Sequence, residues 1–195
     1  MTDEIKKQII IYLIEDDTSQ RESIESLLAF KGYLVKSFRN ANDFLKLNNI
    51  HRPSVLITDI HLPGQSGVDL HSELLKHSID FPVIFISGES TIQQSINAMK
   101  QGAFEFLVKP FDINDLVIAI EKACNFELKR LSLNELIKRL SPREKEVYNY
   151  LIQGLNNNEL TEKMNISIPT VKQYKSEVMR KLGINSLSQL IDLSH

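Results

Sequence analysis

The sequence predicts an α/β domain with a doubly wound, five-stranded parallel sheet, joined by a helical linker to a small, all-α four-helix domain. From residue 8 to about residue 112, short β-branched runs alternate with amphipathic helical stretches. This alternation is typical of a parallel sheet that is covered by helices on both faces. Residues 141–195 show helical periodicity only, with breaks at Gly154, Pro169 and Gly183.

Five apolar runs are the expected strands, and they cover residues 9–14, 34–38, 55–58, 83–86 and 104–108. The intervening segments carry helical stripes, and two of these helices are expected to stop at Gly32 and Gly102. Residues 114–140 contain no Pro or Gly, which predicts a fifth helix that continues as a linker, with a kink near Ser132. The expected divisions are therefore residues 1–124, 125–138 and 139–195.

The composition excludes several classes of protein. Of the 195 residues, 42% are hydrophobic and 25% are charged, which is an ordinary globular balance and not that of a disordered or fibrous chain. No apolar run approaches the roughly 20 residues that a membrane span requires, so we expect no membrane partner and a cytoplasmic location. The single cysteine, Cys124, excludes an intramolecular disulfide framework and a thiolate metal cage.

Charged and hydroxyl side chains follow or end four of the expected strands. Glu15 and Asp16 follow the first strand and Asp59 follows the third, while Ser87 ends the fourth and Lys109 the fifth. The carboxyl ends of parallel strands meet at one edge of the sheet, which is where such sheets bind ligands. Three neighbouring carboxylates repel one another unless a cation is present, and hard oxygen ligands of this kind suit Mg²⁺.

The chemistry expected of such a pocket is phosphoryl transfer. A carboxylate beside Mg²⁺ is a competent nucleophile for a phosphoryl group. The metal and a lysine would neutralise the charge that develops on the phosphoryl oxygens, and the Ser87 hydroxyl would donate a hydrogen bond to the product.

Four ordered motifs make residues 8–125 resemble a response-regulator receiver domain, which implies a flavodoxin-like fold. The motifs are Leu13-Ile14-Glu15-Asp16-Asp17, the segment Thr58-Asp59-Ile60-His61-Leu62-Pro63-Gly64-Gln65-Ser66-Gly67, Ile86-Ser87-Gly88 and Val108-Lys109-Pro110-Phe111. Each motif is weak alone, but together, in this order and at these strand ends, they are specific.

The resemblance implies a role for each residue of the pocket. Asp59 would accept a phosphoryl group from a phosphohistidine of a sensor histidine kinase. Asp16 and Asp59 would bind Mg²⁺, with Glu15 acting through water and the backbone carbonyl of His61 as a further ligand.

Three further residues would respond to the phosphoryl group. Lys109 would bind it, Ser87 would be the switch hydroxyl, and Phe106 falls where the family places its switch aromatic residue.

The C-terminal residues predict two short helices joined by a sharp turn. Ser141 is expected to cap a helix whose first turn contains Pro142, and residues 157–164 form a short second helix. Ser167 would cap a third helix, on which Val171, Tyr174, Val178 and Leu182 form one buried stripe. This leaves polar and basic side chains on the other faces, as in a helix-turn-helix that enters the DNA major groove.

Residues 138–195 resemble the LuxR/NarL-type helix-turn-helix DNA-binding domain, and the full arrangement is similar to the FixJ-like response regulators. The matching residues are Leu140-Ser141-Pro142-Arg143-Glu144, Gly154, Asn157, Glu159-Leu160, Ile166-Ser167, Thr170-Val171-Lys172 and Lys181-Leu182-Gly183. The resemblance implies base contacts by Lys172, Gln173 and Ser176. It implies phosphate contacts by Lys175 and Lys181, and pairing of a second copy through Leu187, Leu190 and Ile191.

Three positions depart from that family pattern. Asn158 stands where members often carry a phosphate-contacting lysine, Tyr174 where histidine is common, and Glu177 where asparagine is common. The loss of one cation and the gain of one anion are expected to weaken non-specific DNA affinity and its dependence on salt.

The combined prediction is a non-enzymatic transcription regulator, with a sensor histidine kinase and double-stranded DNA as partners. Phosphorylation would produce a homodimer, and RNA polymerase is a further candidate partner. Two alternatives stay open. A phosphohydrolase with an aspartyl nucleophile would need a general acid two residues later, where this chain has His61. A receiver-like protein that works without phosphate would not require so much buried like charge.

Overall fold

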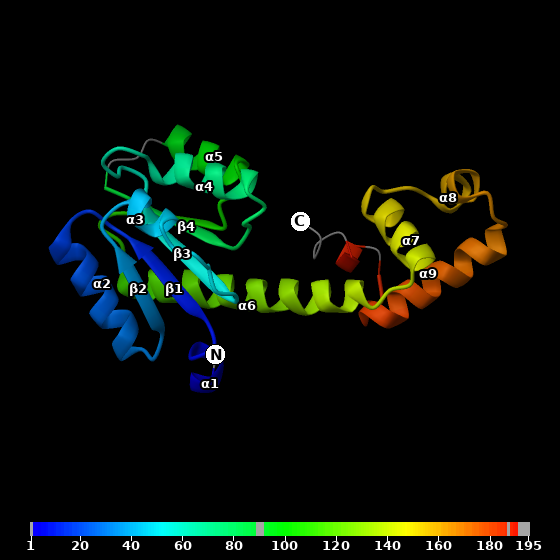
Figure 1. The fold of residues 1–195 in the computed structure, drawn as a ribbon, viewed down its shortest axis with the longest axis horizontal. Coiled ribbons are helices and arrows are strands. Elements are labelled where there is room, and N and C mark those ends of the chain that lie inside the picture. Colours follow the sequence, from blue (N-terminus) through cyan, green and yellow to red (C-terminus); the bar gives the residue numbers. More distant parts are fainter. Residues whose placement is uncertain (1, 89–91, 187, 191–195) are drawn as a thin grey trace. The chain divides into compact units, whose positions relative to one another are not determined.

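The computed structural model describes residues 2–88, 92–186 and 188–190 (Figure 1). The chain divides into two compact units, Met1–Leu128 and Lys129–His195. Among the described residues, no helix combines the length and the apolar character that crossing a membrane requires.

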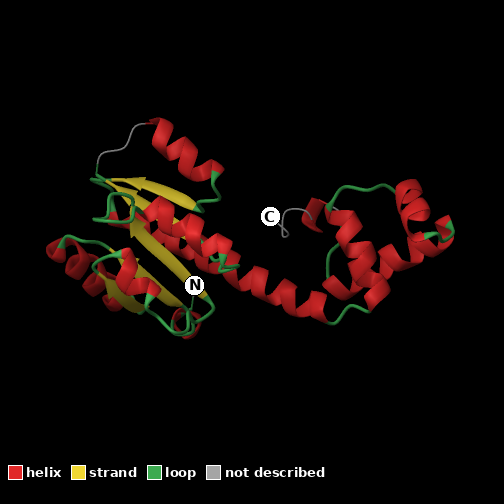
Figure 2. Cartoon of the chain, turned by 45° about the horizontal axis from the view of Figure 1, so that its top comes forward, coloured by secondary structure: helices red, strands yellow, loops and turns green. Residues whose placement is uncertain are grey.

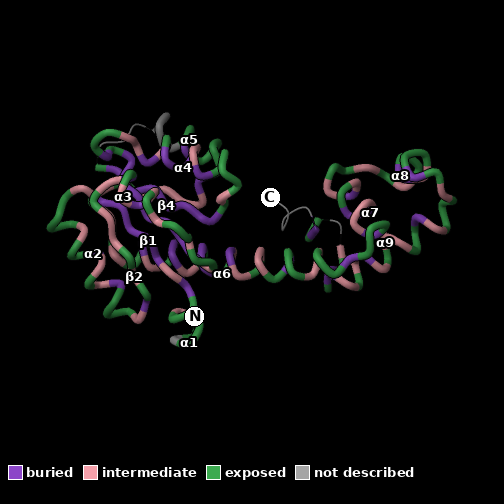
Figure 3. Tube along the Cα trace, viewed as in Figure 1, coloured by how far each residue is buried: buried purple, intermediate pink, exposed green. Residues whose placement is uncertain are grey.

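The first unit is built on a five-stranded, entirely parallel sheet with the strand order β2-β1-β3-β4-β5. The strands are β1 (Ile10–Ile14), β2 (Leu34–Phe38), β3 (Ser54–Asp59), β4 (Val83–Ser87) and β5 (Glu105–Val108). Every residue of β3 and β4 is buried, which the long β-branched runs in the sequence predict (Figure 3). The predicted doubly wound sheet is confirmed.

Helices cover both faces of this sheet (Figure 2). One face packs against α2 (Thr18–Phe30) and the first part of α6 (Ile113–Lys138), with a core that includes Leu28 and Ile120. The other face packs against α3 (Ala41–Leu45), α4 (Gly67–Lys76) and α5 (Ile92–Lys100), with Phe44, Leu70 and Ala98 in its core. A four-residue helix, α1 (Asp3–Lys6), precedes β1 and has no counterpart among the expected elements.

Helix α6 runs without interruption from Ile113 to Lys138, through the position near Ser132 where the sequence predicts a kink. The division between the two units falls inside this helix, at Leu128. Glu127 on α6 has no exposed surface, and its carboxylate accepts two hydrogen bonds from Arg52, at 2.8 Å from Nε and 2.9 Å from Nη2. This bidentate ion pair fixes α6 to the segment before β3, which keeps Glu127 within the first unit.

The second unit contains α7 (Pro142–Ile152), α8 (Asn157–Met164) and α9 (Ile168–Leu182), followed by helical residues 188–190. Side chains cap two of these helices as the sequence predicts: Ser141 and Glu144 form a capping box on α7, and Ser167 caps α9. Asn165, with φ of 52°, ends α8 in the left-handed conformation and makes the sharp turn. Most of the expected fourth helix lies outside the described residues.

Candidate functional site

The parallel register brings the four candidate strand ends to one edge of the sheet. Ile14 lies beside Thr58, Asp59 beside Ile86, and Ser87 beside Val108. Residues that follow these strands along the chain are therefore neighbours in space, although up to 94 residues separate them in sequence.

Lys109 connects two of the predicted acidic residues. Its Nζ donates hydrogen bonds to Oε2 of Glu15 and Oδ2 of Asp59, both at 2.7 Å. Glu15 is 2% exposed and Asp59 is 7% exposed, so both carboxylates have left bulk water. One cation between two buried carboxylates leaves net negative charge at this edge of the sheet.

Burial and pairing act on the protonation of these groups. Burial raises the pKa of Glu15, and the hydrogen bond and charge of Lys109 offset this rise only in part. Burial by itself would lower the pKa of Lys109, but its hydrogen bonds to Asp59 and Glu15 outweigh that effect and raise it. Lys109 is therefore held as a cation.

The second oxygen of Asp59 is held by the backbone that follows it. The backbone N–H of His61 donates to Oδ1 of Asp59 at 2.8 Å. Gly67 packs directly under this turn, because a Cβ built on it would lie 2.3 Å from the Asp59 carbonyl oxygen. Its N–H also donates to the carbonyl of Ile60 at 3.0 Å. The Gly67 backbone thus fixes the turn that aims the Asp59 side chain.

Asp16 is half-buried and follows Glu15 directly. Arg21, which the sequence analysis missed, donates from Nη1 to the carbonyl of Glu15 at 2.8 Å and so ties this acidic turn to α2. The only sequence signal for this contact is an arginine in the first turns of the helix that follows the acidic pair.

The donor chemistry of the pocket fits a hard divalent cation, since Glu15 and Asp59 present carboxylate oxygens that already share one cation. Across the described ranges, however, no three His, Cys, Asp or Glu side chains stand together as a metal-binding group. The predicted set of Asp16, Asp59, Glu15 and the His61 carbonyl therefore stays a prediction.

The two predicted switch residues lie on adjacent strands. Ser87 is fully buried at the end of β4, and its carbonyl accepts a hydrogen bond from the Lys109 N–H at 2.8 Å. Phe106 on β5 pairs in register with Phe85 and is partly buried against the core of that face. Both positions adjoin the Lys109 segment, and their motion stays a prediction.

A groove of about 710 Å³ opens beside Lys109. Helix α2 contributes Ser19, Gln20, Ser23 and Ile24 to its walls, and the segment around β5 and α6 contributes Gly88, Lys109, Pro110, Phe111 and Ile113. The groove is largely apolar and extends to Lys109, which contacts Asp59. The sequence predicts Lys109 as part of the pocket but does not predict the groove.

Helix α9 presents the predicted DNA-contact residues on its open side. Lys172, Gln173 and Ser176 are exposed, and Lys175 is half-buried. The opposite side of the helix buries Val171, Val178 and Leu182 in the core of the unit, as the predicted stripe requires, with Tyr174 packed partly against it. The exposed polar face is therefore a consequence of how the helix packs.

Lys181 is placed differently from the other predicted contacts. Its Nζ lies 2.7 Å from the Glu144 carboxylate, which is also the capping-box partner of the Ser141 N–H. The Lys181 hydrogen bond and then the Ser141 N–H lower the pKa of Glu144. Lys181 therefore already has an acidic partner inside its own unit, and its predicted phosphate contact would have to compete with that pair.

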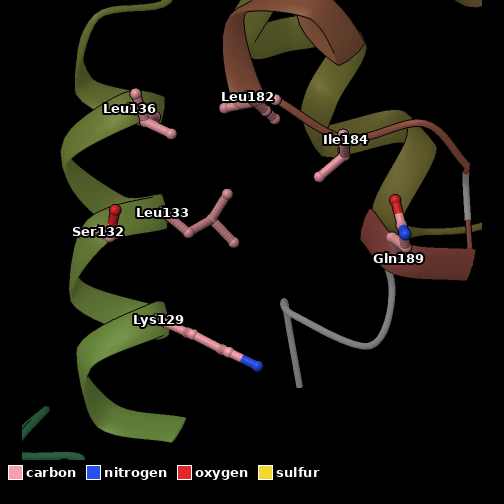
Figure 4. Close-up of a pocket in the computed structure, with 8 residues that line it drawn as sticks. Lys129, Ser132, Leu133, Leu136, Leu182, Ile184 and Gln189 are labelled. Atoms are coloured by element: carbon pink, nitrogen blue, oxygen red, sulfur yellow. The ribbon is translucent and has the colours of Figure 1, made fainter. Parts of the chain in front are cut away.

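Of the three residues predicted to pair two copies, Leu187 and Ile191 lie outside the described residues, and Leu190 is fully buried in the core of its own unit. A pocket of about 490 Å³ lies nearby, between the C-terminal part of α6 and the end of α9 (Figure 4). Its apolar lining is Leu133, Leu136, Leu182 and Ile184. Leu190 therefore contributes to the core of its own unit.

Comparison with known proteins places both units. The family profile of the response regulator receiver domain matches residues 11–121, and that of the bacterial regulatory proteins of the luxR family matches residues 138–194. Nodulation protein W of Bradyrhizobium diazoefficiens is 35% identical over 98% of this chain and 87% of its own length. The transcriptional regulatory protein FixJ of the same organism is 32% identical over 94% of this chain and 93% of its own.

Solved structures agree with these matches. The response regulator StyR is 32% identical, covers 96% of this chain with 98% of its own, and gives a TM-score of 0.60. Full-length FixJ from B. japonicum is 32% identical, with 96% of each chain covered and a TM-score of 0.55.

Proposed function

This chain belongs to the response regulators that join a receiver domain to a luxR-family DNA-binding domain, and from that premise we propose that phosphorylation of Asp59 drives dimerisation and sequence-specific DNA binding. The family consists of transcriptional regulators that are not enzymes, so the phosphohydrolase alternative falls. Its two domains imply a sensor kinase and DNA as partners.

The contact of Lys109 with Asp59 is the observation that carries the phosphorylation proposal. An Asp59 carboxylate oxygen attacks the phosphorus of a phosphohistidine, a P–O bond forms, the P–N bond breaks, and the imidazole leaves. Lys109 is held cationic beside that oxygen, so its ammonium group offsets the charge on the transferred group. Glu15 contributes a buried negative charge that favours a cation in the pocket.

Receiver domains typically bind Mg²⁺ for this reaction. We assign its binding to Asp16, Asp59, the His61 carbonyl and, through water, Glu15. When bound, the ion would neutralise charge on the phosphoryl oxygens and on the carboxylates. Arg21 and the His61 N–H position the two acidic turns.

The groove beside Lys109 is our candidate for the surface that receives the phosphodonor. It is lined by Lys109, whose Nζ contacts the Asp59 carboxylate, and it offers apolar contact through Ile24, Phe111 and Ile113. A kinase domain docked there would bury part of this groove while its phosphohistidine faces Asp59.

The response surface is proposed around α5, β5 and α6. Four apolar side chains there are 42–50% exposed: Ile96, Met99, Val108 and Ile118. A phosphoryl group on Asp59 adds charge and hydrogen-bond acceptors, to which the Ser87 hydroxyl and Phe106 would move. The shift would favour pairing of two receivers through this apolar surface.

Two paired copies bring two α9 helices to one duplex. Lys172, Gln173 and Ser176 would contact base edges, while Lys175 would bind phosphate. We keep Lys181 as a weaker phosphate contact, RNA polymerase as a candidate partner, and the cytoplasm as the place of action. Leu187 and Ile191 stay candidate pairing residues, and Leu190 would support them from the core of the unit.

The proposal is tested by sedimentation velocity of the full chain with and without beryllofluoride and Mg²⁺. We expect dimer content to rise with the mimic and to stay at the basal value in Asp59→Asn. Asp17→Asn is the matched control, because asparagine preserves the cap that Asp17 provides for α2 and should leave the response intact. Equal sedimentation of the wild type in both conditions contradicts the phosphoswitch and leaves constitutive DNA binding as the alternative.

A further inference from the structure

Two of the four basic side chains of helix α9 already form ion pairs with glutamates of the same unit. The four cations of α9 are Lys172, Lys175, Arg180 and Lys181. Lys181 is paired with Glu144, and Arg180 is paired with Glu177 on α9 itself. Lys172 and Lys175 form no ion pair with any residue that the structure describes. The helix thus offers about half of its formal positive charge to an incoming phosphate.

The Glu177–Arg180 pair lies on the open side of α9. Oε2 of Glu177 accepts from Nη2 of Arg180 at 2.7 Å and from Nε at 3.2 Å. Arg180 is 68% exposed and Glu177 is 42% exposed at the side chain. Glu177 follows Gln173 by four residues, so the two side chains lie on the same face of the helix. An anion therefore stands directly beside residues that we assign to base contacts.

A carboxylate at this position has opposite effects on two kinds of DNA. Non-specific binding derives almost entirely from cation–phosphate contacts, so it suffers from both the added anion and the capture of Arg180. A base edge with an amino group, above all cytosine N4, can instead donate a hydrogen bond to the carboxylate. A duplex that places such an amino group opposite Glu177 gains a hydrogen bond that offsets the repulsion between this carboxylate and the DNA phosphates.

We propose that Glu177 is a specificity-determining residue: it weakens binding to unrelated DNA through its charge and its hold on Arg180, and it favours operators that present an amino donor. This inference rests on the proposed DNA-binding function. Binding by a protein with this residue is therefore weaker overall and more selective than the four cations of α9 would suggest.

The experiment compares wild type and Glu177→Gln in the presence of beryllofluoride and Mg²⁺. Two probes are used: a duplex selected by the wild-type chain from a random library, and a pool of unselected duplexes. We expect the variant to bind the unselected pool about fivefold more tightly at 0.1 M salt, with a salt slope steeper by about one. Affinity for the selected duplex should change by less than about twofold, so the ratio of the two affinities falls.

Two control variants isolate the cause. Glu146→Gln breaks the ion pair with Arg143, which has the same three-residue spacing on α7, and should leave both affinities unchanged. Arg180→Gln combined with Glu177→Gln should give a smaller gain on unselected DNA than Glu177→Gln alone, because no arginine is then released. Thermal unfolding by circular dichroism checks that the variants fold.

Each outcome decides the inference. An equal gain on both probes, or no gain on either, overturns the role of Glu177 in specificity while leaving DNA binding intact. A wild-type chain that binds neither probe and selects no sequence overturns the DNA-binding proposal itself.

Discussion

Two lysines of this chain pair with buried glutamates, and their surroundings differ. Lys109 lies between Glu15 and Asp59, which come from the ends of two different strands. Among the described residues Lys181 pairs with one carboxylate, that of Glu144, which also caps α7. The receiver pocket keeps an excess of negative charge, whereas the charges of Lys181 and Glu144 balance one to one. The excess negative charge around Lys109 suits that site to bind a cation and a phosphoryl group. The balanced charges of Lys181 and Glu144 suit that pair to stabilise the fold.

The largest difference between the two units is expected in the free energy of unfolding when one glycine of each unit is replaced by alanine. Gly67→Ala should lower the free energy of unfolding of the receiver by about 3 kcal/mol, because the new Cβ would lie 2.3 Å from the Asp59 carbonyl oxygen. The loss should occur although alanine is the better helix former. Hydrogen exchange of peptides from each unit of the full chain measures it.

Gly154→Ala is the comparison variant in the helical unit. Gly154 has φ of 83°, and apart from its chain neighbours no atom of the described residues lies within 4 Å of the place that a Cβ would take, so backbone strain is what opposes the substitution. We expect a loss of about 1 kcal/mol. Equal losses at the two positions contradict the assignment of Gly67 to a close backbone contact.

Removal of each lysine tests the charge contrast directly. Lys109→Gln should lower the free energy of unfolding by about 2 kcal/mol, because two nearly buried carboxylates then face each other without a cation. Lys181→Gln should cost only about 0.5–1 kcal/mol, since Lys181 is one-third exposed and Glu144 keeps its hydrogen bond from Ser141. Urea unfolding followed by hydrogen exchange separates the units. A larger loss in Lys181→Gln would reverse the comparison.

The units should also differ in their response to acid. His71 is 3% exposed, and burial lowers its pKa below the ordinary value of 6.5 despite the opposing charge of Asp80. The unfolded chain then binds a proton more readily, so receiver stability is complete above about pH 6.5 and falls as the pH drops toward the folded-state pKa. The slope cannot exceed about 1.4 kcal/mol per pH unit for one group.

In the helical unit, Glu144 has a lowered pKa, so its contribution is present above the unfolded-state value of about 4.3 and is lost only at lower pH. Between pH 6.5 and 5 the protonation of His71 should weaken the receiver, while the raised pKa of Glu15 acts in the opposite direction and the helical unit stays unchanged. His71→Phe should flatten that dependence, measured by hydrogen exchange across this range. An unchanged pH slope in this variant would remove His71 as the cause.

Local patterns in the sequence were sufficient for most of the fold. Continuous β-branched runs located the strands, and the acidic pocket followed because residues that directly succeed parallel strands share an edge. Serine followed by proline located the start of α7, and Ser167 located the start of α9. The first helix, α1, has only four residues and therefore shows no periodicity that sequence analysis could detect.

Contacts between distant residues could not be predicted in this way. The pairing of Lys181 with Glu144 joins residues 37 apart, and Arg52 meets Glu127 across 75 residues. Such contacts depend on packing between elements that are distant in the sequence, which no local pattern encodes. The sequence therefore predicts only a phosphate contact for Lys181, because its pairing with Glu144 depends on how α7 packs against α9.

We propose that phosphorylation of Asp59 controls the binding of DNA by α9. The affinity of the full chain for its selected duplex, measured by fluorescence anisotropy with and without beryllofluoride and Mg²⁺, tests this most directly. We predict at least a roughly tenfold gain with the mimic, since a dimer binds two half-sites where a monomer binds one, and no gain in Asp59→Asn. Equal affinity of the wild type in both conditions would mean that phosphorylation of Asp59 does not control DNA binding.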